Sequence, residues 1–180
     1  MAITWANVLE WQTGPLDEIA QTLFEASQGL REAYEMGQDD LNAVRSEGEA
    51  VTAMRATTIT NLASLERALT NVNGALMAIE GARDGVATVM SLVNSTLAFA
   101  AENDCTIHPD GSITGEGTKN RRGEPSIALA KLGHMIKDAI TYADQVDTEL
   151  FHALQDINND RYTDGDGANN KVVGVPDFPQ

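Results

Sequence analysis

Apolar side chains recur three and four positions apart along most of the chain, a spacing that marks one face of an α-helix. The longest series is interrupted only at Arg83, and its apolar members are Leu62, Leu65, Leu69, Val72, Leu76, Ile79, Val86, Met90, Val93 and Leu97. A period of 3.5 residues sustained over this length is typical of one long helix with a coiled-coil-like seam. We place it at about 41–102, with its start near Leu41 or near Gly48. A helix of about 50 residues would be roughly 80 Å long.

Shorter series predict one helix on either side of the long one. The first, at about 14–36, opens with Pro15 and ends at Gly37; its apolar positions are Leu16, Ile19, Leu23, Leu30 and Tyr34. Asp17 and Glu18 lie in its first turn, where the helix dipole favours anions. The second, at about 124–158, opens at Pro125; its apolar positions are Leu129, Leu132, Ile136, Ile140, Ala143, Val146, Leu150, Leu154 and Ile157.

A stripe of small residues lies on the long helix, at Gly74, Ala78, Gly81 and Gly85. Each glycine costs the helix on the order of 1 kcal/mol relative to alanine. Several in one row therefore indicate that another helix approaches the backbone closely there. Few charged residues lie between Ala68 and Ala101, which indicates a helix covered on more than one side. We interpret the stripe as a helix-packing or partner interface.

Turn residues mark the end of the long helix. Pro109-Asp110-Gly111 is flanked by the short alternations Thr106-Ile107 and Ser112-Ile113, a pattern that predicts a small β-hairpin near 105–114. Residues 161–180 are rich in Gly, Asp, Asn and Pro, which predicts a flexible tail. The expected fold is all-α: an elongated antiparallel helical bundle over 1–160 with one very long central helix.

The charge balance narrows the function classes. The chain has 12 basic and 27 acidic residues and a formal net charge of −15. Such a surface repels nucleic-acid phosphates and anionic lipids, so we expect neither as a partner. The one cysteine, Cys105, excludes a disulfide framework. No cleavable signal peptide is recognisable, and the apolar run from Val86 to Ala101 is too short and too interrupted to span a bilayer.

Candidate catalytic and metal sites are sparse. His134 with Asp138, and His152 with Asp156, are i,i+4 pairs, but each supplies two ligands where a metal site needs three or four. We therefore interpret them as solvated helix surface. The segment 162–167 resembles a calcium loop but lacks the carboxylates that an EF-hand has at its first and last positions. No nucleophile elbow, P-loop or dinucleotide motif is present, so we expect no enzyme and no cofactor.

Both tryptophans, Trp5 and Trp11, precede the first predicted helix. They could bind a partner, because tryptophan is enriched at interfaces. The alternative is that they fold back and cover the open end of the bundle.

The order of these features resembles the helical N-terminal domains of actinobacterial type VII (ESX) secretion substrates, relatives of the small Trp-x-Gly secreted proteins. The resemblance covers roughly 3–157 and is carried by Trp11-Gln12-Thr13-Gly14-Pro15-Leu16, the long helix, the Asp110-Gly111 hairpin and Ala143-Asp144-Gln145-Val146-Asp147. It implies a protein that acts through helix–helix pairing with a partner or with itself. It also implies secretion without a cleavable signal peptide.

The resemblance also suggests where export signals would lie. The family's Trp-x-Gly turn would fall on Ser46-Glu47-Gly48, where serine replaces the tryptophan. The C-terminal Tyr-x-x-x-Asp/Glu signal would fall on Tyr162 and Asp166. We therefore expect a non-enzymatic type VII substrate or targeting-domain-like protein. The alternatives are an intracellular or phage-encoded coiled-coil adaptor that stays in the cytoplasm, and a metal-binding helical protein or enzyme built on His134, Asp138 and His152.

Overall fold

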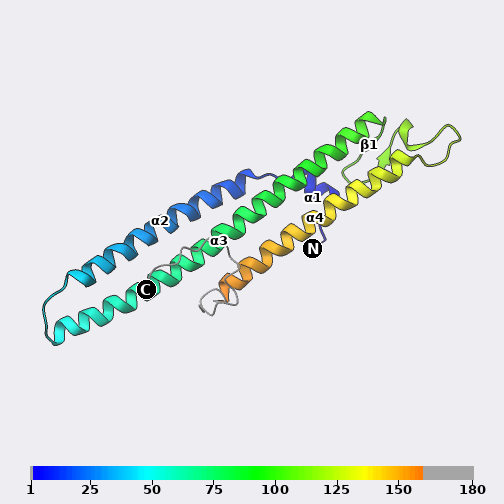
Figure 1. The fold of residues 1–180 in the computed structure, drawn as a ribbon. Coiled ribbons are helices and arrows are strands. Elements are labelled where there is room, and N and C mark those ends of the chain that lie inside the picture. The colour runs from blue at the N-terminus through cyan, green and yellow to red at the C-terminus, as the bar shows by residue number, and fades with distance from the viewer. Residues whose placement is uncertain (1, 160–180) are drawn as a thin grey trace. The chain divides into compact units, whose positions relative to one another are not determined.

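The computed structural model describes residues 2–159 and shows an all-α fold, as expected, with 78% of the described residues helical. The elements in chain order are α1 (Trp5–Leu9), α2 (Gly14–Ala43), α3 (Glu49–Glu102), β1 (Thr106–Ile107), β2 (Ile113–Thr114), the 3₁₀ turn η1 (Glu116–Thr118) and α4 (Ile127–Asn158) (Figure 1). The predicted tail at 161–180 lies outside the described residues.

Two predicted helix boundaries are wrong, each for a local reason. α2 continues through Gly37 to Ala43, because this glycine makes room for the neighbouring helix: a Cβ there would lie 2.8 Å from Cδ2 of Leu62. Of the two predicted starts of α3, the structure has the one near Gly48: the helix begins at Glu49, after a connection that ends at Gly48 with a φ of 142°, which favours glycine. α4 begins at Ile127 because Pro125 forms a β-bridge with Lys119, outside the helix.

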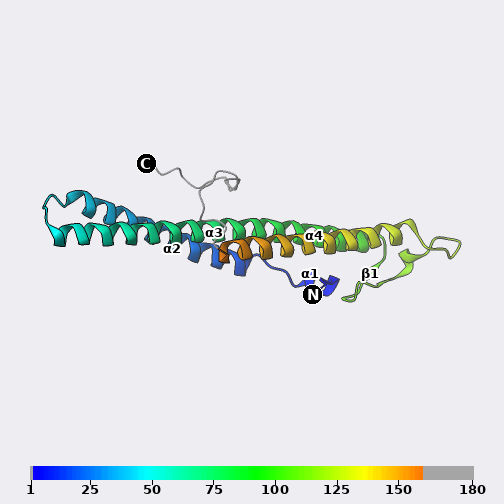
Figure 2. The ribbon, with the colours of Figure 1, turned by 90° about the horizontal axis from the view of Figure 1, so that it is seen from below.

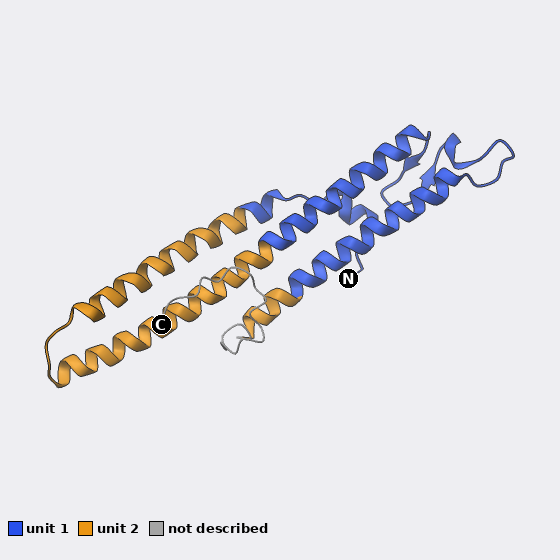
Figure 3. Ribbon diagram, viewed as in Figure 1, with its two compact units in different colours: residues 1–17, 80–151 blue, residues 18–79, 152–180 orange. Residues whose placement is uncertain are grey.

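The chain divides into two compact units (Figure 3). Unit 1 comprises residues 1–17 and 80–151, and unit 2 comprises residues 18–79 together with the chain from 152 onward. Both α3 and α4 contribute residues to each unit.

The core of unit 1 lies between the second half of α3 and the antiparallel α4. Buried positions alternate at four- and three-residue spacing on both helices: Ala82, Val86, Val89, Val93, Thr96 and Ala100 on α3, and Leu132, Ile136, Ala139, Ala143 and Val146 on α4. The predicted seam shares Val86 and Val93 with this set. Two other predicted members in this half of α3 lie outside the buried set: Met90 is half-buried and Leu97 is 39% exposed. Small side chains on both helices fill the seam, which permits a close approach of the backbones.

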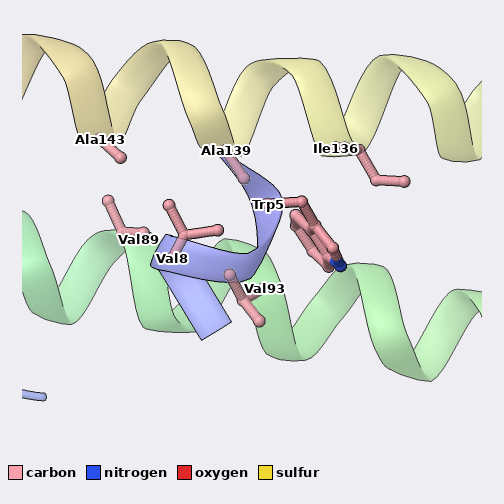
Figure 4. Packing of buried hydrophobic residues seen from close by; sticks show 7 residues of the cluster. All are labelled: Trp5, Val8, Val89, Val93, Ile136, Ala139 and Ala143. Atoms are coloured by element: carbon pink, nitrogen blue, oxygen red, sulfur yellow. The ribbon is translucent and has the colours of Figure 1, made fainter. Parts of the chain in front are cut away.

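Helix α1 packs against this core. Thr4 and Asn7 form a capping box at its start, with Thr4 Oγ1 accepting from the Asn7 amide at 3.4 Å. Trp5 and Val8 share one face, and both are buried in the same cluster as Val89 and Val93 of α3 and Ala139 of α4 (Figure 4). A helix of five residues has little intrinsic stability, so its position depends on these two side chains.

The predicted β-hairpin is confirmed. β1 and β2 are antiparallel, with Thr106 opposite Thr114 and Ile107 opposite Ile113. The chain then turns back tightly beneath the end of α3. At Gly117 a Cβ would collide with the backbone carbonyl of Asn103, so only glycine fits there. Cys105 is buried beside Ala100 and Leu132 and is a free thiol.

In unit 2, α2 runs antiparallel to the first half of α3 (Figure 2). The less exposed positions of α2 again alternate at three and four: Ala20, Leu23, Ser27, Leu30, Tyr34, Gly37 and Leu41. The start of α3 shows the same spacing at Val51, Arg55, Thr58, Leu62 and Leu65, whereas every residue from Ala68 to Ile79 is half-buried or buried. The seam predicted from Leu62 to Ile79 therefore faces the interior of this unit. The contact between α2 and α3 also contains a polar pair that the apolar pattern did not predict: Ser27 Oγ donates to Asn73 Oδ1 at 2.6 Å.

By length and composition alone, α3 is long and apolar enough to cross a membrane, contrary to the expectation from the run Val86 to Ala101. The core helix of a soluble protein meets the same criterion. In unit 1 the apolar face of α3 is covered by α4 and α1.

Candidate interaction surfaces

The small residues of α3 do not form one surface. Gly85 is buried against α4, where a Cβ would lie 2.6 Å from Cγ2 and 2.9 Å from Cγ1 of Val146. Gly81, one turn earlier, is exposed, and a Cβ there would meet nothing within 4 Å. Gly74 is buried and Ala78 is half-buried. Close packing within the chain is therefore shown at Gly85, while Gly81 faces outward.

The two tryptophans differ in burial. Trp5 is 2% exposed and lies in the cluster between α3 and α4, and Trp11 is half-buried against the edge of that cluster. The side chain of Trp5 is therefore used within the fold. Its Nε1 has no hydrogen-bond partner among the described residues, so apolar packing alone holds the ring.

Arg83, which interrupts the apolar series, lies at an edge of the α3 seam. Its guanidinium pairs with Asp84 at 3.2 Å and with Asp17 at the start of α2 at 3.6 Å. The hydrogen bond and the charge of Asp84 raise the pKa of Arg83. The side chain of Arg83 is 37% exposed, so the pair to Asp17 adds little stability.

Of the four residues expected to carry export signals, the structure describes two. Ser46 and Gly48 are exposed in the connection between α2 and α3. Gly48 O accepts from both the backbone amide (2.9 Å) and the hydroxyl (3.0 Å) of Thr52, which closes the first turn of α3. Tyr162 and Asp166 lie outside the described residues, as does the calcium-like segment 162–167.

The histidines and acidic residues do not converge on a metal site within residues 2–159: there, no group of three or more His, Cys, Asp and Glu side chains could hold an ion. His108 is engaged in the β-hairpin, where its Nε2 lies 2.8 Å from Thr114 Oγ1. Asp110 accepts hydrogen bonds from the hydroxyl (2.6 Å) and the amide (2.9 Å) of Ser112. These bonds lower the pKa of Asp110 and close the turn.

One stretch of unit 2 has no core of its own. We call residues 31–61 the α2–α3 arm: it comprises the end of α2, the connection, and the start of α3. No side chain in the arm is fully buried. Three large apolar side chains are prominently exposed: Met36 at 67%, Ile59 at 56% and Met54 at 45%. The guanidinium of Arg55 donates to the Val44 carbonyl and so ties the connection to α3.

Comparison of the chain with protein-family models, with curated proteins and with solved structures gives no match. The resemblance to type VII secretion substrates therefore rests on the sequence features quoted above.

Proposed function

We propose that this chain is a non-enzymatic interaction protein of the type VII secretion substrate class, and that it acts by pairing its α2–α3 arm with helices of a partner or of a second copy. The observation that carries the proposal is the absence of any buried side chain between residues 31 and 61, all of which the structure describes.

Two long helices in contact along one narrow seam are marginally stable in water, because most helix stability in proteins comes from burying an apolar face. In unit 1 the seam is completed by α1, which covers α3 and α4 with Trp5 and Val8. The arm has a comparable seam without such a cover. A partner helix that buries Met36 and Ile59 would remove apolar area from water, at about 25 cal/mol per Å².

Co-expression tests the pairing. The chain would be produced with and without the product of the neighbouring gene, and the mass of each species measured by size-exclusion chromatography with light scattering. We expect a complex or a homodimer. Met36→Glu and Ile59→Glu should disrupt it without reducing helicity, because both side chains are exposed. Ile127→Glu is the matched control: this isoleucine is 89% exposed but belongs to unit 1. A monomer under every condition would contradict the proposal.

Export is tested separately, by detection of the protein in the culture supernatant. We expect it to be secreted and expect Tyr162→Ala to abolish secretion. If the wild-type chain stays in the cytoplasm while the secretion machinery is intact, export is wrong and the intracellular adaptor is the better interpretation.

A further inference from the structure

The positive charge of this acidic chain is concentrated in one segment. Residues 117–137, which we call the basic segment, contain five Lys or Arg residues and one Glu, a formal charge of +4 in a chain of −15. The five are Lys119, Arg121, Arg122, Lys131 and Lys137, and all are exposed. Three of them fall within four positions, in the loop between η1 and α4.

Asn120 holds this loop in one conformation. Its Oδ1 accepts from the amides of Arg122 (2.8 Å) and Glu124 (3.1 Å), and its Nδ2 donates to Glu124 Oε2 at 3.0 Å. The backbone closes over the same residues, with the Asn120 amide donating to the Glu124 carbonyl at 2.8 Å. Gly123 has a φ of 81°, which allows the reversal.

Two further contacts attach the loop to α4. Ser126 Oγ donates to the Gly117 carbonyl and accepts from the Leu129 amide at 3.0 Å, so one side chain both ties the loop base and caps the helix. Arg121 and Arg122 therefore extend from a fixed turn, and little backbone freedom is lost when they bind something.

The arginines have no counter-charge of their own. Neither Arg121 nor Arg122 nor Lys119 forms an ion pair within the described part of the chain. The nearest acidic residue in sequence, Glu124, is engaged by Asn120, and the first turn of α4 carries no acidic side chain.

We infer that the loop around Arg121 and Arg122 is a recognition site for an acidic segment of a partner protein. Arginine suits this role because its planar guanidinium donates two parallel hydrogen bonds to one carboxylate. The site is distinct in chemistry from the apolar α2–α3 arm, and the inference does not depend on export or on pairing through that arm.

The acidic remainder of the chain favours a short carboxylate-bearing peptide over nucleic acids and anionic membranes as the ligand of this loop. Nucleic acids and anionic membranes present long arrays of negative charge, which the acidic residues elsewhere in the chain would repel. A short acidic peptide contacts only the loop. At physiological ionic strength, exposed charges more than about 8 Å away are largely screened.

The test uses the full chain and a fluorescently labelled oligo-glutamate peptide, with binding followed by anisotropy and by amide chemical shifts. We expect binding that weakens with salt and shifts localised to 119–124. Replacing both arginines, Arg121→Ala with Arg122→Ala, should weaken binding at least about tenfold, because the loss of even one charge-assisted hydrogen bond has that effect. Asn120→Ala, which keeps the charge and releases the turn, should weaken it by about twofold to fivefold. Arg67→Ala, at an exposed position of α3 outside both the loop and the α2–α3 arm, should have no effect.

Undetectable peptide binding, or binding that the double substitution leaves unchanged, would overturn the inference. Equally tight binding of a single-stranded oligonucleotide or of phosphatidylglycerol vesicles would show a general polyanion site and also overturn it. Salt-sensitive self-association lost in the double variant would assign the site to a second copy of the chain, not to a different protein.

Discussion

Two glycines one helical turn apart on α3 have different surroundings. Gly85 lies against the branched side chain of Val146, which has no long flexible end that could move aside. Gly81 faces open space. The same substitution at the two positions should therefore have effects of opposite sign.

Gly81→Ala should stabilise the protein by up to about 1 kcal/mol, because alanine is the better helix former. Gly85→Ala should destabilise it by about 1–3 kcal/mol, because the added methyl group overpacks the α3–α4 seam. Urea unfolding measures both free energies. Equal effects at the two positions would show that α4 does not pack against α3 at Val146.

Trp5 is buried, and its indole N–H has no acceptor among the described residues. Trp5→Phe should therefore cost much less than Trp5→Ala, for which the loss of a large buried side chain is about 3–5 kcal/mol. Thermal unfolding of both variants measures the difference. A phenylalanine variant as unstable as the alanine variant would show that the N–H has a partner after all.

Asp110 should show a pH dependence at the β-hairpin. Hydrogen bonds from Ser112 lower its pKa from the ordinary value of 3.8, so their stabilising effect is complete above that value and is lost as the pH falls through the lowered pKa. Ser112→Ala removes the hydroxyl donor and should raise the pKa of Asp110. NMR titration of the carboxyl group measures it; an unchanged pKa would contradict the hydrogen bond between the two side chains.

At the scale of the helices, a buried polar pair sets how α2 and α3 align. Ser27 is 6% exposed and donates to Asn73 within an otherwise mostly apolar seam. A displaced alignment would leave these polar groups without partners, and such pairs are known to specify register in coiled coils.

Ser27→Ala should destabilise the protein by about 1–3 kcal/mol, because it leaves the Asn73 carbonyl oxygen without its donor. The double variant with Asn73→Ala should cost less than the sum of the two single changes, and chemical denaturation of all three measures the coupling. Strict additivity would show that the two side chains do not interact.

The helices follow from periodicity, whereas their ends and part of their packing do not. The pattern predicts a helix end at Gly37, which polar residues follow, yet here the glycine receives Leu62 within a seam. In the second half of α3, the apolar series predicts that large residues such as Leu97 form the core. The core instead uses Ala82, Thr96 and Ala100, since the alanines of α4 let the two helices approach closely.

The candidate sites were less predictable than the fold. The Pro109-Asp110-Gly111 turn carries its own backbone preferences, so the hairpin could be located from local sequence. The basic residues at 119–122 are close together in the sequence, but only the structure shows the hydrogen bonds to Asn120 that hold the loop. Whether a helix face is covered depends on residues far away in the chain, so the open α2–α3 arm could not be inferred from its own pattern.

At the scale of the whole molecule, burial is distributed unevenly along the chain. Unit 1 has a core to which α1, α3 and α4 all contribute, whereas the α2–α3 arm has no fully buried side chain. Segments with few buried apolar contacts open at low free energy, and binding to a partner stabilises them by mass action. The proposed pairing function therefore predicts a difference in local stability within one chain.

Amide hydrogen exchange of the full chain measures this difference. In the monomer, we expect amides in 31–61 to exchange much faster than those of α3 and α4 around Val89 and Ala139. We also expect the arm to become protected when the chain dimerises or binds its partner. Slow, uniform exchange of the arm and the unit 1 core in a monomer would contradict the proposed pairing, because the arm would then be complete without a partner.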